Sequence, residues 1–387
     1  MYNHKKEHGA VSLFVVIFAA LLITVVAVSF IRIMVRDQQQ ASTVDLSQSA
    51  YDSAQAGTED AKRALLRYQS ICSKGSAAEC SDARDKVGAN ECNAGLDGIV
   101  TPVNNEVQVQ QDQSPGDIAL DQAYTCVKVT LDTPDYLGVL QANASKVIPL
   151  VSKNPFNKIR LEWYTSKNLQ TDNNFDVDLL PETSGTPLLA QSSWKPNRPS
   201  IMRTQLMQFG SNFTLGSFDD TNAGQSNVNT LFLYPTGVTG AVNPTIDARK
   251  FIERDIRKTP TDDRPLPISC SGSLTSVGYA CSVDLELPDS IGAGTRTAFL
   301  RLSSIYNATN YRLTLSQDAV AAPFDGVQPQ IDATGRANDL FRRVQSRVET
   351  VDANFPYPDA AVDITGNFCK YFLITDDVNN YLNSCTP

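Results

Sequence analysis

Residues Ala10–Ile31 have the sequence AVSLFVVIFAALLITVVAVSFI, a run of 22 residues without a charged side chain. A helix needs about 20 predominantly apolar residues to cross the hydrocarbon core of a bilayer. In lipid the backbone must satisfy its own hydrogen bonds, so a spanning segment must be helical. A cleaved secretory signal has a shorter apolar region followed by a small-residue cleavage site, whereas Arg32 and Arg36 follow this run. The run therefore predicts a retained transmembrane helix.

Three hydroxyl side chains interrupt the apolar run, at Ser12, Thr24 and Ser29. We expect each of them to donate a hydrogen bond to a carbonyl oxygen of the preceding turn. Two lysines precede the run and two arginines follow it, so the positive-inside rule is nearly balanced and leaves the orientation open.

The cysteines favour an orientation. All of them follow the apolar run, and their number is even: Cys72, Cys80, Cys92, Cys126, Cys270, Cys281, Cys369 and Cys385. Eight cysteines allow 105 pairings, and local spacing suggests that they pair in sequence order. No two of them have the C-x-x-C spacing of a zinc or redox motif. Disulfides in an oxidising compartment fit better than buried free thiols, so we expect the N-terminus in the cytoplasm and the C-terminal region outside it.

The histidines limit the chemistry. The chain has two, His4 and His8, and both precede the apolar run. The region after the run therefore lacks the residue needed for Ser-His-Asp catalysis, His-ligated metal sites and His proton shuttles. A glycosidase needs only two carboxylates, but no local pattern indicates such a pair. We expect a protein without catalytic residues, metal ligands or cofactors.

One acidic stretch resembles a calcium loop. Residues Asp172–Asp178 place oxygen ligands at alternate positions, as calcium loops do. Position six is Val177 rather than glycine, and position twelve is Thr183 rather than glutamate. These departures exclude an EF-hand, and a solvated hairpin tip is the expected alternative to another kind of calcium site.

The overall charge argues against nucleic acid. The formal net charge is −9, whereas a nucleic-acid surface needs clustered basic residues. The densest basic stretch, Arg336–Arg347, contains Asp339 and is followed by Glu349. We interpret it as a solvated face.

The helix is expected to continue beyond the membrane, over residues 32–68, because no proline occurs there. Small residues recur on one face at steps of three and four, at Ala50, Ala54, Gly57, Ala61 and Ala64. Small residues allow close helix approach. This face could lie on the chain's own domain or form a packing seam toward neighbouring subunits.

The remainder predicts an α+β protein with a mostly antiparallel β head. Residues 1–9 form a leader, 10–31 the membrane helix, 69–195 stapled loops and a first β-rich unit, and 196–387 a second β-rich unit. Six segments alternate apolar and polar residues between turn-rich spacers, which indicates half-buried antiparallel strands: 124–131, 158–165, 231–234, 279–287, 297–302 and 311–315. For residues 340–351 the period is ambiguous, and we favour a strand. Cys270 and Cys281 would staple a hairpin.

The N-terminus resembles that of type IV pilin-like proteins. A basic leader, His4-Lys-Lys-Glu-His-Gly9, precedes Ala10-Val-Ser-Leu-Phe14 and the apolar run. Beyond it, Arg36-Asp-Gln-Gln-Gln-Ala41 and the alanine-rich residues 50–61 are similar to minor pilins with an X-type N-terminal domain and to K-type minor pseudopilins. The resemblance covers about residues 4–68. Cys369 and Cys385 resemble the closing disulfide loop of many pilins.

The resemblance implies cleavage by a prepilin peptidase between Gly9 and Ala10, followed by methylation of Ala10. It implies partners too: membrane lipid before assembly, an inner-membrane assembly platform, and other pilin-like subunits that pack on the N-terminal helix. Major pilins carry glutamate at the fifth mature position, where this chain has Phe14. Minor subunits of the K type and some of the X type lack it as well, so the likeness implies a subunit that primes or caps a filament at the cell surface.

Two other functions fit the same sequence. A pseudopilin of a type II secretion-like apparatus would have the same chemistry in a different machine. A permanently signal-anchored surface adhesin or binding module would keep residues 1–9 and never enter a filament.

Overall fold

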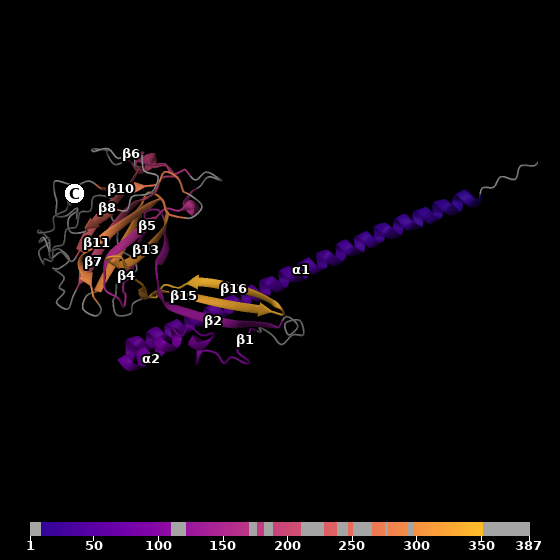
Figure 1. Cartoon of the computed structure of the whole chain (residues 1–387), viewed down its shortest axis with the longest axis horizontal. Coiled ribbons are helices and arrows are strands. Elements are labelled where there is room, and N and C mark those ends of the chain that lie inside the picture. Colours follow the sequence, from indigo (N-terminus) through magenta and orange to yellow (C-terminus); the bar gives the residue numbers. More distant parts are fainter. Residues whose placement is uncertain are drawn as a thin grey trace, which may run out of the picture. The chain divides into compact units, whose positions relative to one another are not determined.

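A computed structural model describes residues 9–109, 121–169, 176–181, 189–209, 228–237, 247–250, 265–274, 278–292 and 297–350 of the chain (Figure 1). The first element, α1 (Gly9–Lys74), is a single helix of 66 residues. At 1.5 Å per residue it is about 100 Å long. It ends at Gly75, whose N–H donates to the Ile71 carbonyl oxygen at 2.7 Å. The predicted membrane helix and its extension are thus one continuous element.

A second helix, α2 (Ala77–Val87), follows in a region expected to be loops. Its start is a capping box, in which the Ser76 hydroxyl accepts from the Glu79 N–H and the Glu79 carboxylate accepts from the Ser76 N–H. Such a box satisfies two of the donors left open at a helix start. The Ser-x-x-Glu spacing was the signal that the sequence interpretation missed. The Cys72–Cys80 disulfide joins α1 to α2. After α2 the chain forms the short 3-10 helix η1 (Ala94–Leu96).

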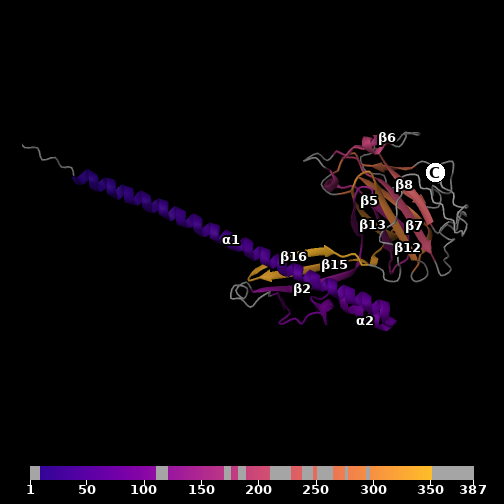
Figure 2. The same cartoon turned by 180° about the vertical axis from the view of Figure 1, so that it is seen from behind.

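A four-stranded antiparallel sheet lies against α1. Its order is β1 (Val107–Gln108), β2 (Gln122–Thr133), β15 (Phe324–Ala337) and β16 (Leu340–Arg347). Figures 1 and 2 show α1 and this sheet from opposite sides. Side chains of α1, α2, η1, β2 and β15 share one hydrophobic core, whose members include Leu65, Val87, Leu96, Val129 and Ile331. We call this sheet, α2 and residues 47–74 of α1 the stem.

Glycine and alanine let α1 approach the stem sheet closely. A Cβ atom on Gly57 would lie 2.8 Å from Val127 Cγ2, and one on Gly335 would lie 2.2 Å from both the Ala50 carbonyl oxygen and the Ala54 nitrogen. Real Cβ contacts are not that short, so the backbones of α1 and β15 touch at Gly335, where the strand carries no side chain.

Residues Tyr136–Ala322, which we call the head, form a twelve-stranded sheet that is mostly antiparallel. Its strands are β3 (Tyr136–Leu140), β4 (Ser145–Leu150), β5 (Phe156–Trp163), β6 (Leu180–Pro181), β7 (Ile201–Phe209), β8 (Val228–Gly237), β9 (Asp247–Lys250), β10 (Leu266–Cys270), β11 (Cys281–Ile291), β12 (Thr297–Ile305), β13 (Thr309–Gln317) and β14 (Val320–Ala322). The parallel pairs are β6 with β8, β8 with β10, and β9 with β11. Short 3-10 helices, η2 (Ser166–Asn168) and η3 (Gln191–Ser193), lie between strands.

The head sheet curls around one core. Ile148 of β4 and Leu313 of β13 come from strands far apart in the sheet order, yet both are fully buried in the same hydrophobic core. Strands such as β5, β10 and β13 alternate in burial, so they point one side chain in two into this shared interior. All six predicted strand segments lie in or overlap strands of the structure, and residues 340–347 of the ambiguous segment form β16.

The head is an insertion within the stem. The chain leaves the stem sheet after β2 and returns to it at β15, so β2 and β15 pair although 190 residues separate their facing ends, Thr133 and Phe324. The expected boundary near residue 195 does not divide the described strands, because β5 before it and β11 and β13 after it are neighbours in one sheet. Among the described residues, the strands on the two sides of residue 195 therefore belong to one head sheet, which is inserted within a discontinuous stem.

Three of the suggested disulfides are present. They join Cys72 to Cys80, Cys92 to Cys126, and Cys270 to Cys281. Cys270 and Cys281 face each other in the β10–β11 hairpin, as the sequence predicts. Cys369 and Cys385 lie outside the described residues.

Replacing Gly335 by alanine tests the close approach of α1 and β15. The added methyl group meets backbone atoms that cannot rotate away, so we expect the free energy of unfolding to fall by about 1–3 kcal/mol. Gly272→Ala is the matched control, because a Cβ atom there meets nothing within 4 Å. Urea unfolding of the full chain in detergent measures both variants. Equal stabilities for the two would contradict this packing.

Candidate functional site

The N-terminal part of α1 is an apolar surface without cover. Every described side chain from Leu13 to Val44 is exposed, including Phe14 at 71% and Phe18 at 72%. Among the described residues, α1 is the one helix long and apolar enough to cross a membrane. Burying one such side chain is worth about 1.5–3 kcal/mol. A surface of this kind requires lipid or another protein against it.

Two of the three hydroxyls in the apolar run bond as predicted. The Thr24 hydroxyl donates to the Leu21 carbonyl oxygen at 2.8 Å, and that of Ser29 donates to the Val25 carbonyl oxygen at 2.8 Å. The side chain of Ser12 lies outside the described part of the chain. Gly9 and Ala10, the predicted processing pair, are the first two residues of α1.

Between the apolar run and the stem, over residues 36–45, α1 is mostly polar, with Val44 as its one large apolar side chain. Residues 36–45 are exposed, and they include three consecutive glutamines, Gln38–Gln40. Within the described part of the chain, the first side-chain hydrogen bond from α1 to the stem sheet is at Ser47, whose hydroxyl accepts from Arg342 Nε at 2.7 Å. A stretch of helix thus joins the anchor to the stem with no packing of its own.

The small-residue face of α1 lies against the chain's own stem sheet. Ala50, Ala54 and Ala61 are completely buried, Ala64 is 3% exposed, and Gly57 contacts side chains of β2. Of the two interpretations that the sequence left open, packing on its own domain therefore describes these five residues. A neighbouring helix would have to use other faces of α1.

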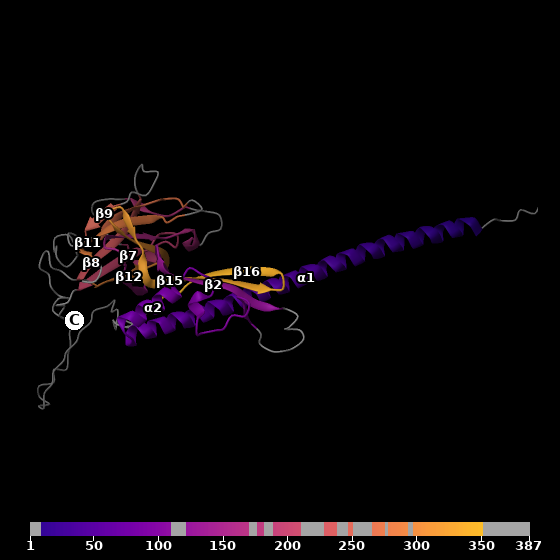
Figure 3. The same cartoon turned by 60° about the horizontal axis from the view of Figure 1, so that its bottom comes forward.

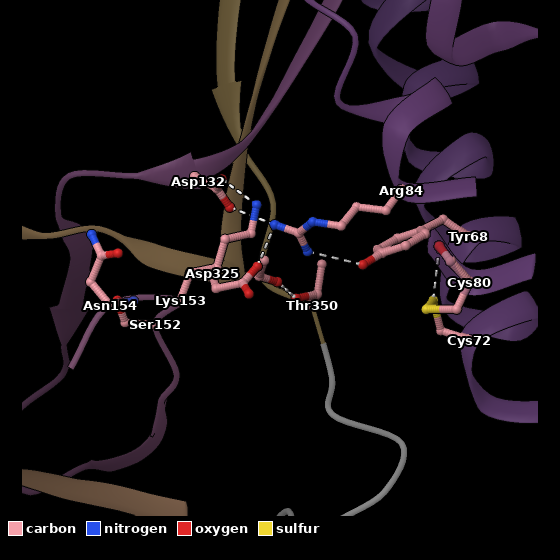
Figure 4. Close-up of polar contacts among 11 residues, drawn as sticks. Tyr68, Cys72, Cys80, Arg84, Asp132, Ser152, Lys153, Asn154, Asp325 and Thr350 are labelled. Carbon is pink, nitrogen blue, oxygen red and sulfur yellow. Dashed lines mark hydrogen bonds and ion pairs between the residues drawn. A yellow bond between two sulfur atoms is a disulfide. The ribbon is translucent and has the colours of Figure 1, made fainter. Parts of the chain in front are cut away.

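A cluster of charges closes the end of the stem that is farthest from the apolar run (Figure 4). Arg84 of α2 lies 2.7 Å from an oxygen of Asp132, at the end of β2, and 2.6 Å from an oxygen of Asp325, at the start of β15. It also donates to the Tyr68 hydroxyl of α1 at 3.3 Å. Lys153 of the head pairs with the second oxygen of Asp132 at 3.0 Å. One guanidinium thus ties α1, α2, β2 and β15 together (Figure 3 shows these elements from below).

The Arg84 guanidinium is held in its charged form. Burial lowers its pKa, but the charge and hydrogen bond of Asp325 and the hydroxyl of Tyr68 outweigh burial, and the net pKa is raised. A cavity of about 330 Å³ adjoins the cluster, between α2 and residues 129–132 of β2. The sequence interpretation missed this cluster, because its residues are far apart in the chain and no local motif links them.

The predicted acidic loop is only partly described. Of residues 172–178, the structure describes Asp176, Val177 and Asp178. The Asp178 carboxylate pairs with Lys195 Nζ at 2.9 Å and with Arg198, while Val177 is buried in the head core. Asp178 is thus neutralised by cations of its own chain. Within the described residues, no group of three or more His, Cys, Asp or Glu side chains is placed to hold a metal ion.

Arg198, which pairs with Asp178, also packs on a cluster of aromatic rings. Arg198 lies 5.0 Å above the Trp194 ring, and that ring packs against Tyr234 and Tyr306 at centroid distances of 5.8 and 5.2 Å.

Burial raises the pKa of Asp178, but hydrogen bonds and charges from Lys195 and Arg198 outweigh it, and the net pKa is lowered.

Comparison with known proteins gives no relative. No family model, curated protein or solved structure matches the chain.

Replacing Arg84 by methionine tests the charge cluster. The half-buried Asp325 then loses its cation, so we expect a loss of about 1–3 kcal/mol in the free energy of unfolding. Lys86→Met on the same helix is the matched control, because both partners of the Lys86–Asp82 pair are more than half exposed and such pairs contribute about 0–1 kcal/mol. Urea unfolding compares the variants. A Lys86 variant as destabilised as the Arg84 variant would contradict the assigned role.

The lowered pKa of Asp178 predicts a pH dependence. A carboxylate with a lowered folded pKa stabilises the protein above its ordinary value of 3.8 and loses that contribution as the pH falls through the folded value. We therefore expect Asp178→Asn to be less stable than the wild type at neutral pH, with a difference that shrinks below about pH 4. Urea unfolding between pH 3 and pH 7 measures this difference. A constant difference would refute it.

Proposed function

We propose that this chain is a non-catalytic minor pilin-like subunit, anchored in the membrane before assembly, that primes or caps a type IV pilus-like filament. The single observation that carries the proposal is the division of α1 into two parts. Its apolar part, up to Val35, is wholly exposed, whereas its small-residue part is covered by the chain's own sheet. One helix thus offers a free apolar surface at one end and a rigid attachment at the other.

The mechanism follows from the physics of that surface. In the bilayer, lipid covers the apolar side chains of residues 10–31. In a filament, helices of other subunits cover them instead, so the subunit can move from lipid into a filament core without exposing this surface to water. Removal of the basic leader before Ala10 would free the helix for extraction by an assembly platform.

The place of the head supports a terminal position in the filament. The chain enters and leaves the head at Thr133 and Phe324, beside the cluster that holds Tyr68 near the end of α1. The insertion therefore begins at the end of the stem opposite the membrane run. A bulky insertion there leaves the flanks of the apolar run free. Phe14, in place of the glutamate of major pilins, fits a subunit that starts or ends a filament rather than repeats in it.

The disulfides support a head outside the cytoplasm. Three pairs lie in the stem and head, and disulfides persist in oxidising compartments. With the N-terminus in the cytoplasm, the head would be outside the cell membrane and, after assembly, at the cell surface. A type II secretion-like pseudopilin and a permanently anchored adhesin are the alternatives.

Mass spectrometry of the N-terminal peptide tests the proposal on the native protein extracted from membranes. We expect the peptide to begin at Ala10 and to carry a methyl group, because a prepilin peptidase would cut after Gly9. Gly9→Leu is the matched variant, and we expect it to keep its leader and to be absent from filaments. A wild-type protein that retains residues 1–9 would contradict the proposal and leave an anchored surface module.

A further inference from the structure

The exposed apolar side chains of the head lie along one edge of its sheet. Among the described residues of the head, three large apolar side chains are more than a third exposed: Leu137 at 37%, Val139 at 57% and Val320 at 70%. Leu137 and Val139 belong to β3, and Val320 belongs to β14. Both strands pair with the same side of β13. Edge strands are usually guarded by charges, prolines or bulges, and this edge carries apolar side chains instead.

The β3 edge has an open pair of backbone groups. Backbone groups alternate in an antiparallel strand, so if Leu137 points its N–H and C=O away from β13, Val139 does so as well. The side-chain amide of Gln328, from β15, satisfies both groups of Leu137, accepting from its N–H at 2.9 Å and donating to its carbonyl oxygen at 2.7 Å. Gln328 thus occupies the place of one residue of an added strand. No hydrogen bond of the described residues satisfies the same two groups of Val139.

A groove continues from this open position. Its volume is about 470 Å³, and its lining includes Leu137, Val139, Lys167, Tyr279 and Tyr311. Tyr279 lies beneath the Arg312 guanidinium at 5.3 Å, and Glu162 holds that guanidinium at 2.6 Å. Gly138 forms part of the floor, because a Cβ atom there would lie 2.4 Å from the Tyr311 hydroxyl. The floor is therefore rigid and partly aromatic.

Lys167 gives the groove a charge. It has no ion-pair partner among the described residues, and it lines the groove together with Thr165 and Ser166. An acidic side chain or a C-terminal carboxylate would complement it.

We propose that the β3 edge and its groove bind an extended peptide segment of another protein, which adds as a short strand beside Val139 and places an acidic group near Lys167. Main-chain hydrogen bonds give affinity in this mode of recognition, and the side-chain groove gives specificity. The proposal concerns the ligand of the head and holds whether or not the chain enters a filament.

The test uses the full chain in detergent micelles. A phage-displayed library of random 12-residue peptides is selected against it, and an enriched peptide is synthesised with a fluorescent label. We expect the enriched sequences to alternate apolar residues and to contain an acidic residue. Fluorescence anisotropy then measures the affinity for the wild type and three variants.

Val139→Pro removes only the outward N–H, because proline is tolerated at an edge position whose N–H does not pair within the sheet. We expect it to weaken binding about tenfold, and Lys167→Glu to weaken binding of the acidic peptide by a similar factor. Ala321→Pro is the matched control, because Ala321 lies on the β14 half of the same edge, outside the groove, and alternation directs its N–H outward too. It should bind like the wild type.

A peptide-side test avoids any change in the protein. N-methylation of the peptide amide that donates to the Val139 carbonyl oxygen should weaken binding, whereas N-methylation of the next amide along should not, because alternate amides face away from β3. The absence of enriched peptides, or equal binding by the wild type and Val139→Pro, would overturn the proposal. So would equal losses from Val139→Pro and Ala321→Pro.

Discussion

The contact between α1 and β15 is the constraint on which the stem depends. Ala50 and Ala54 of the helix meet Gly335 of the strand at backbone distance, and the stem core packs further along the same two elements, from Ala61 of α1 and Ala333 of β15. This contact lies at the end of β15 that is away from the head, where Gly335 pairs with Tyr124 of β2, so it joins α1 directly to the stem sheet. Any side chain at Gly335 would separate the helix from the stem sheet.

The sequence predicts the local elements well and their assembly poorly. The uncharged run from Ala10 to Ile31 and the absence of proline predict the long helix, and alternation predicts the strands. Nothing local predicts that β2 pairs with β15, because the pairing depends on contacts between residues about 190 positions apart. The break expected near Trp194 failed for the same reason: prolines around it mark a loop within the head, not a boundary between domains.

The candidate sites show the same limit. Pairing the cysteines in sequence order predicted the three described disulfides. The small residues of α1 predicted a packing face, but their periodicity alone could not identify the surface that this face contacts. Arg84 and Gln328 act through partners on distant strands, so neither belongs to a motif. Both residues lie where the head joins the stem. Arg84 pairs with the carboxylates of Asp132 and Asp325, and Gln328 bonds the backbone of Leu137; the insertion would otherwise leave these groups without partners.

The polar stretch of α1 between Arg36 and Leu46 has a mechanical consequence. No described part of the chain packs on these roughly three turns of helix, and a helix without packing is marginally stable in water. The apolar run on one side would be held by lipid or by other helices, and the part of α1 on the other side is held by the stem. Bending and angular freedom are therefore concentrated in this short segment, which would act as a compliant joint between the anchor and the stem. Tension applied to the head would stretch this joint before it disturbed the core of the stem.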